Sequence, residues 1–498
     1  MLPGGSAPER VLFSTTPPGR AAYQKAPAAR VPVRLGLPCL HASEPVGTSM
    51  IARWRGRLAG ILPRGVILLS ALTFASYVMG LVRDRTFART FGAGSELDVY
   101  NAALVLPELV LDVLVIAGLS SAFVPVFSRL RHEGDGTQVF ARTVLTASVL
   151  VMLVTVSILF ILAPQTVTLV APGFDPAQQA EYTQLFRVMC VTAVIFAASF
   201  ALGEMLVVRQ RFLSYGLAPV LYNTGIVLGA VLLSPSMGIL GAAIGTVIGA
   251  LMHLGVRVIE IARTDFRYRP ALAVRSHGFQ RYLRLSIPKA VAQPIEPLTF
   301  LFFTSVASTF AAGSISAVSF ARNFQSVPVA LIGVAFAVTA FPVMSAAAAD
   351  GDRARFTRLV ATNLVTITVL TLGAAIGLWL VGGYAVELFL GGEAFDAEDV
   401  ELTTMLLGAF ALSVPLEAMT HLLSRALYST NNTILPVTAS VVGLVVTVLT
   451  VNLLLDGHGV VALPLGFAAG LVAKVIVSAA ALVFRLRTVG TAPEVEGA

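Results

Sequence analysis

Ionisable side chains stand inside several long apolar stretches of this 498-residue chain, and they are the residues best suited to chemistry. Each costs several kcal/mol in hydrocarbon unless it faces a cavity or a partner. Lys289 and Glu296 are seven residues apart, and Glu108 and Asp112 four apart, so on continuous helices each pair would share one face. Together with Arg322, these charges predict a water-lined cavity that binds a charged substrate or an ion.

A second set of ionisable residues repeats every four positions. Glu417, His421 and Arg425 would form a stripe along one helix, suited to ion coupling or gating. The stripe is equally consistent with an interhelical polar contact that only fixes packing. Prolines at 288, 294 and 297 flank Lys289 and Glu296, and they predict either a broken helix beside a cavity or tolerated kinks.

The chain lacks the motifs of nucleotide and metal chemistry. It contains no P-loop, no glycine-rich dinucleotide fingerprint and no His/Cys cluster, so we expect no catalytic residue, no cofactor and no metal. Its two cysteines, Cys39 and Cys190, provide no disulfide framework. We therefore expect no enzyme, and any work should draw on ion gradients, membrane potential or substrate supply.

Composition predicts an all-α polytopic membrane protein. Hydrophobic residues make up 56% of the chain and charged residues 12%, with a mean hydropathy of +0.84. The net charge of +7 comes from arginines between apolar segments, a pattern that orients a membrane protein and does not indicate nucleic-acid binding. We expect about twelve transmembrane helices, near residues 65–88, 98–128, 137–163, 180–207, 213–234, 237–260, 280–308, 314–346, 358–386, 401–428, 433–455 and 459–485.

The loops alternate in charge along the chain. Those on one side carry arginine pairs or clusters, whereas the loops at 164–179, 310–314 and 387–400 contain neither Lys nor Arg. The positive-inside bias therefore predicts a multi-pass protein of the bacterial inner membrane with both termini cytoplasmic. Arg83, Arg85 and Arg89 violate this bias and need another reason to be where they are.

A turn sequence recurs at half-length. Thr90-Phe91-Gly92-Ala93-Gly94-Ser95 returns 219 residues later as Thr309-Phe310-Ala311-Ala312-Gly313-Ser314. Such a repeat predicts two related six-helix lobes facing each other. We expect an N-lobe over 50–262, a basic cytoplasmic linker over 263–285, a C-lobe over 286–488 and a tail over 489–498. Residues 1–49 are interpreted as a disordered or mis-assigned extension, with Met50 as the alternative start.

Several short runs in the chain resemble the MurJ/MviN-type lipid II flippases of the multidrug, oligosaccharidyl-lipid and polysaccharide exporter superfamily. They are Gly80-Leu81-Val82-Arg83-Asp84, Phe91-Gly92-Ala93-Gly94, Leu106-Pro107-Glu108, Ala122-Phe123-Val124-Pro125, Phe320-Ala321-Arg322-Asn323 and Leu427-Tyr428-Ser429. The resemblance implies two lobes, alternating access and a central cationic cavity. Arg83 and Asp98 match charged cavity positions of the family, and Arg322 precedes by one residue the usual cavity arginine, where this chain has Asn323.

The chain also departs from the family pattern. Tyr77 stands where the first span commonly has an arginine, and Leu111, Asp112 and Ile116 replace an arginine pair and a glutamate. The family usually has fourteen spans, whereas about twelve are expected here.

The charges inside the expected spans and the positions that match the family together give the expected cavity residues. They are Arg83, Asp98, Lys289, Glu296, Arg322 and Asn323.

The resemblance implies a flippase for undecaprenyl-pyrophosphate-linked peptidoglycan precursor, lipid II, with membrane lipids and the cell-wall synthesis machinery as partners. One alternative is a related ion-coupled exporter of drugs or other lipid-linked oligosaccharides. Another is a non-transporting partner in envelope assembly.

Overall fold

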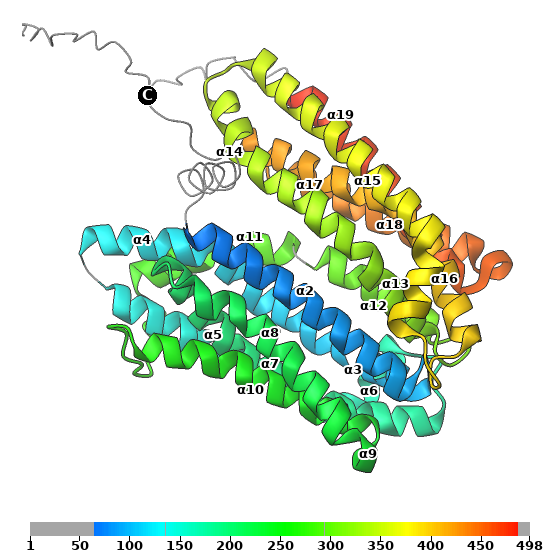
Figure 1. Cartoon of the computed structure of the whole chain (residues 1–498). Helices are drawn as coiled ribbons and strands as arrows, with labels where there is room; N and C mark the ends of the chain where they lie inside the picture. The colour runs from blue at the N-terminus through cyan, green and yellow to red at the C-terminus, as the bar shows by residue number, and fades with distance from the viewer. Residues whose placement is uncertain (1–63, 135, 293, 487–498) are drawn as a thin grey trace, which may run out of the picture. The chain divides into compact units, whose positions relative to one another are not determined.

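The computed structural model describes residues 64–134, 136–292 and 294–486, and within these ranges it is helical without strands (Figure 1). The predicted extension over 1–49 and the tail over 489–498 lie outside the described residues. The first helices are α2 (Arg64–Phe91), α3 (Ser95–Leu111), α4 (Val124–Glu133), α5 (Thr137–Ile161), α6 (Ala163–Val170), α7 (Pro176–Val208), α8 (Phe212–Leu232), α9 (Ser234–Met237) and α10 (Ile239–Ala262). Two wide π-helical turns, η1 (Asp112–Ile116) and η2 (Leu119–Phe123), join α3 to α4.

The helices after residue 276 repeat part of this pattern. They are α11 (His277–Ala292), α12 (Ile295–Ala307), α13 (Ser314–Pro328), α14 (Ala335–Ala349), α15 (Arg353–Leu390), α16 (Ala397–Ala411), α17 (Ser413–Ser429), α18 (Ile434–His458) and α19 (Ala462–Leu486). A π-helical turn, η3 (Val329–Val334), joins α13 to α14, and a 3₁₀ turn, η4 (Gly459–Val461), joins α18 to α19.

The described residues contain eight segments long and apolar enough to cross a membrane, or nine if the bent pair α16 and α17 counts as one span. This confirms the prediction of an all-α polytopic membrane protein, while twelve spans remain a prediction. The segment expected at 280–308 is broken, because α11 ends at Ala292 and α12 begins at Ile295. Pro294 lies between the two helices, as the prediction of a broken helix requires, whereas Pro288 and Pro297 lie within helices, as the alternative of tolerated prolines predicts.

The helices pack in two groups (Figure 1). In the first group α10 packs on α7 and α8, α8 on α2, and α7 on α3 and α5. Gly225 and Gly229 of α8 face Gly249 and Gly245 of α10, so the two backbones approach closely, as small residues allow in membrane proteins. In the second group α17 packs on α14, α15 and α19, and α18 packs on α19 and α12.

The two copies of the repeated turn lie against each other. Gly92, with φ of +65°, links α2 to α3, and Gly313, with φ of +93°, immediately precedes α13. A Cβ atom on Gly313 would overlap the carbonyl oxygen of Ala93. Because left-handed backbone favours glycine and the space is closed, Gly313 has two reasons to remain glycine.

We expect the substitution Gly313→Ala to destabilise the protein more than Gly134→Ala. Both glycines have positive φ, but nothing lies within 4 Å of a Cβ placed on Gly134. The control should lose about 1 kcal/mol from backbone strain alone, and Gly313→Ala roughly 2 kcal/mol more from the overlap. Thermal unfolding in detergent measures the difference, and equal Tm values for the two variants would contradict the turn-to-turn contact.

Candidate functional site

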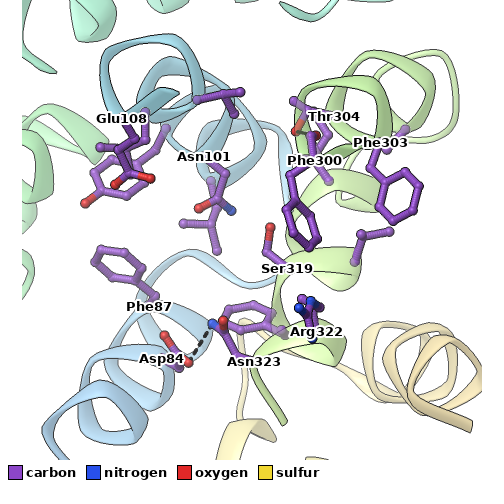
Figure 2. Close-up of a pocket in the computed structure, with 18 of the residues that line it drawn as sticks. Asp84, Phe87, Asn101, Glu108, Phe300, Phe303, Thr304, Ser319, Arg322 and Asn323 are labelled. Carbon is purple, nitrogen blue, oxygen red and sulfur yellow. Dashed lines mark hydrogen bonds between the residues drawn. The ribbon is translucent and has the colours of Figure 1, made fainter. Parts of the chain in front are cut away.

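A cavity of about 450 Å³, here called the central cavity, lies between helices of the two groups. Its walls come from α2, α3 and α8 on one side and from α12 and α13 on the other (Figure 2). Its polar and charged lining residues are Arg83, Asp84, Tyr100, Asn101, Glu108, Tyr222, Thr304, Ser319, Arg322, Asn323 and Ser326. Phe87, Phe300 and Phe303 add aromatic surface. The cavity therefore combines two guanidinium groups with a mixed polar and aromatic wall.

Arg83 is held by groups of the first helical group. Its Nη2 and Nε atoms lie 2.7 and 3.0 Å from Oδ1 of Asp84, and its Nη1 atom donates to Oδ1 of Asn223 at 3.2 Å. The other carboxylate oxygen of Asp84 accepts from Nδ2 of Asn323 at 2.9 Å, as Figure 2 shows. Asp84 therefore neutralises Arg83 and at the same time links α2 to α13.

Arg322 is held by groups of the second helical group. Its Nη2 and Nη1 atoms donate to the two carboxylate oxygens of Glu417 at 2.9 and 3.1 Å, a bidentate pair. Nη1 also donates to Gln325, and a carboxylate oxygen of Glu296 lies 3.8 Å from Nη2. The rings of Phe300 and Phe467 flank the guanidinium, with their centroids 5.1 and 5.3 Å from Cζ.

Asp98 joins α3 to the start of α13. Its carboxylate accepts from the backbone N–H of Gly313 and of Ser316, each at 2.7 Å, and from the hydroxyl of Ser316 at 2.7 Å. A carboxylate is well placed at the N-terminus of α13, where the helix dipole is positive and the first N–H groups lack helical partners. Asn101 donates to the same hydroxyl at 3.2 Å.

Other contacts at this end explain two charges that conflict with the positive-inside bias. Arg85 donates to the carbonyl oxygens of Leu388 and Phe389 at 2.7 and 3.0 Å, near the C-terminus of α15. Cations are favoured at helix C-termini for the same electrostatic reason. Arg83 lines the central cavity, where it pairs with Asp84.

The central cavity brings together Arg83, Arg322, Asn323 and Glu108 from the predicted set. Glu296, Glu417 and His421 line a second, smaller cavity, and Arg425 lies one turn beyond, donating to the backbone oxygen of His421 at 3.3 Å. Asp112 begins the π-helical turn η1 after α3. The functional roles of all these residues remain predictions.

Lys289 and Asp98 are not part of the central cavity wall as far as the described residues define it. The break between α11 and α12 places Lys289 and Glu296 on different helices, so the seven-residue spacing no longer puts them on one face. Helix α11 packs on α4, η1 and η2, and Lys289 interacts electrostatically with Glu204 of α7. Periodicity holds only where a helix is continuous.

Three polar residues were not among the expected site residues. Asp84 adjoins Arg83 in the sequence, and an acidic neighbour is a usable signal for a paired charge. Asn223 is a polar residue in an otherwise apolar helix, and such a residue usually indicates a hydrogen bond to a neighbouring helix. Lys474 lines the second cavity, and only its place in an apolar stretch could have indicated this.

A polytopic helical protein whose two helical groups share a charged cavity has the architecture of a membrane transporter. Residues 87–492 match the model of a protein family described as lipid II flippase MurJ, so the chain belongs to this family.

Two relatives are similar over most of their length. The probable lipid II flippase of Thermotoga maritima is 27% identical over 387 residues, which cover 77% of this chain and 76% of the relative. The lipid II flippase of Burkholderia cenocepacia is 25% identical over 420 residues, covering 82% and 81%.

Solved structures share the fold. A lipid II flippase MurJ in an inward closed conformation superimposes with a TM-score of 0.73 at 22% identity, covering 85% of this chain and 90% of the other. An inward-facing multidrug transporter of the MATE family gives a TM-score of 0.71 at 14% identity, covering 86% and 99%.

We expect Asp98→Asn to weaken the closure between α3 and α13. The amide loses the charge that strengthens three hydrogen bonds, at a cost of about 1.5–3 kcal/mol. Opening should then become roughly tenfold more frequent or greater. The measurement is the rate at which a membrane-impermeant thiol reagent, added outside, modifies a cysteine placed at Ser319 in a chain whose own cysteines are replaced.

Asn101→Leu serves as the matched control for this prediction. It removes one neutral hydrogen bond to the same serine, so its effect should be smaller. If Asp98→Asn and the unaltered chain react at the same rate, the carboxylate does not hold the end closed.

Proposed function

We propose that this protein moves lipid II, an undecaprenyl-pyrophosphate-linked peptidoglycan precursor, across the cytoplasmic membrane by alternating access. The observation that carries the proposal is that Arg83 and Arg322, from different helical groups, line the same cavity. Family membership and relatives named as lipid II flippases support it.

The two arginines suit a pyrophosphate. Guanidinium groups bind phosphate oxygens through charge-assisted, bidentate hydrogen bonds. In the present state each is bound instead to a carboxylate, Arg83 to Asp84 and Arg322 to Glu417. A substrate pyrophosphate would replace these carboxylates as the partner. The cavity volume of about 450 Å³ is in the range of pockets that hold drug-sized head groups.

Alternating access would use the closure around Asp98. We propose an N-lobe over 50–262, a linker over 263–285 and a C-lobe over 286–488. Helix α11 spans the boundary between the linker and the C-lobe, and it packs on α4, η1 and η2 of the first helical group. Rocking of the lobes would separate α13 from Asp98 and open the cavity at that end. We propose that this end faces outward and that both termini are cytoplasmic, supported by the loops at 164–179, 310–314 and 387–400, which contain neither Lys nor Arg.

One observation favours a second candidate function. Glu108 places a carboxylate in the central cavity, as expected for an ion-coupled exporter of drugs or other lipid-linked oligosaccharides. In such an exporter the carboxylate would bind a proton or a cation, and the arginines would matter less.

We expect Arg83→Ala and Arg322→Ala each to lower lipid II transport by roughly tenfold to a hundredfold, because each removes one charged hydrogen-bonding partner of the substrate. The measurement is complementation of a conditional lipid II flippase mutant by the full chain, with transport of labelled lipid II in proteoliposomes. Arg322→Lys should recover part of the activity, since it keeps the charge but not the bidentate geometry.

Arg129→Ala is the matched control. This exposed arginine pairs with Glu133 on α4 and does not line the cavity, so its removal should leave transport unchanged. An unaltered chain that reaches the membrane but neither complements nor transports would contradict the proposal. Greater sensitivity to Glu108→Gln than to either arginine change would favour the exporter. If the variant with both arginines replaced still complements the conditional mutant, the result would favour a non-transporting partner of cell-wall synthesis proteins.

A further inference from the structure

A second cavity of about 200 Å³, here called the C-lobe cavity, lies among α12, α17, α18 and α19. Its ionisable lining residues are Glu296, Glu417, His421 and Lys474, each from an apolar segment. Helix α18 contributes only uncharged residues. Among the described residues, the C-lobe cavity and the central cavity have no lining residue in common. Its charges therefore require an explanation of their own.

Arg322 connects the two cavities. It lines the central cavity, yet its carboxylate partners Glu417 and Glu296 line the C-lobe cavity. The two rings that flank its guanidinium are divided in the same way, because Phe300 lines the central cavity and Phe467 the C-lobe cavity. In Figure 2 Arg322 lies beside Phe300 at the edge of the central cavity. A ligand that draws Arg322 toward either side therefore changes the charge on the other side.

His421 is the group in the C-lobe cavity most suited to exchange a proton near neutral pH. It is half-buried on α17, one turn after Glu417. The charged groups around it are Glu417 and Arg425 on its own helix, Glu296 on α12 and Lys474 on α19. The carboxylates favour a proton on the imidazole, whereas Lys474 and Arg425 oppose it.

The same charges argue against a metal ion as the ligand. The guanidinium of Arg322 and the ammonium of Lys474 repel a further cation, and Glu417 already accepts two hydrogen bonds from Arg322 and one from Gln325. In the described part of the chain no group of three His, Cys, Asp or Glu residues is arranged to hold a metal. A proton needs only one nitrogen lone pair of the imidazole.

We propose that His421 is a proton-binding site coupled through Arg322 to anion binding in the central cavity, an inference that rests on the proposed function. A proton taken from water onto His421 gives Glu417 a second cationic partner. Arg322 can then leave Glu417 and bind the pyrophosphate of the substrate. The coupling is reciprocal, so a substrate that draws Arg322 away leaves Glu417 uncompensated and strengthens proton binding at His421. The N–H bond of the imidazole forms as an O–H bond of a hydronium ion breaks, and no other covalent bond changes.

The first test measures binding of lipid II to the full chain in detergent at about pH 6 and about pH 8. Binding should be roughly tenfold tighter at the lower pH and should take up part of one proton, detected with a dye in weak buffer. The pyrophosphate of lipid II is a diester, so it does not titrate in this range. The His421→Gln variant should bind lipid II with the same affinity at both pH values. If the affinity of the unaltered chain is also the same at both pH values, the proposal is wrong.

His458→Gln is the matched control, because His458 ends α18 and does not line the C-lobe cavity. It should retain the full pH dependence. Lys474→Met removes a cation that opposes the proton, so the pH profile should move to higher pH. If Lys474 only supports the packing of α19, Lys474→Met should lower the affinity for lipid II without moving its pH dependence. That result would count against electrostatic coupling between Lys474 and His421.

The second test needs no substrate. The chain has six histidines, and the signal of His421 in a histidine-labelled sample can be assigned by its loss in His421→Gln. The signal should change with pH, and the change should move to higher pH in Arg322→Gln, where Glu417 lacks its partner. If lipid II does not bind at all, the proposed function is wrong, but this titration still tests whether His421 binds a proton. If the signal of His421 does not change with pH, the proposed proton-binding site is wrong.

Discussion

The pairing of guanidinium groups with carboxylates is the constraint on which the rest of the structure depends. A lone guanidinium in a low-dielectric interior would be severely destabilising, so Arg83 and Arg322 each require a buried carboxylate. Asp84 and Glu417 fill that role, with 6% and 7% of their surface exposed. The two arginines are therefore already neutralised, and under the proposed function a pyrophosphate would replace their carboxylate partners.

The scaffold is more symmetric than its charges. Each copy of the repeated turn introduces a helix that continues through a π-helical turn into a proline-containing helix, as α3, η1, η2 and α4 and then α13, η3 and α14. The first arginine pairs with its own neighbour on α2, whereas the second reaches across to α17. Asp98, beside the first turn, binds the helix that follows the second, so the repeat supplies both halves of one contact.

The membrane class, most helix positions and the repeat could be predicted from the sequence, because apolar length and turn composition are local properties. Arg83 and Arg322 were identifiable because a charge in an apolar stretch is conspicuous. The contact of Asp98 with α13 spans more than 200 positions, and nothing local to either segment specifies it. Lys289 was expected in the cavity because it lies beside prolines that predict a broken helix next to a cavity, and because it stands seven residues from Glu296. The break puts the two residues on different helices, and Lys289 lies on α11, which packs on α4, η1 and η2. Lys474 was visible as a charge, but its neighbours depend on how three other helices pack around α19.

The offset between Arg322 and Asn323 has a geometric consequence. Successive residues of an α-helix are turned by roughly 100° about its axis, so moving an arginine back by one position aims it at a different neighbour. Here Asn323 faces Asp84 across the central cavity, and Arg322 faces Glu417. The position of the cation on α13 therefore directs it toward α17, whereas the next position along the helix faces α2.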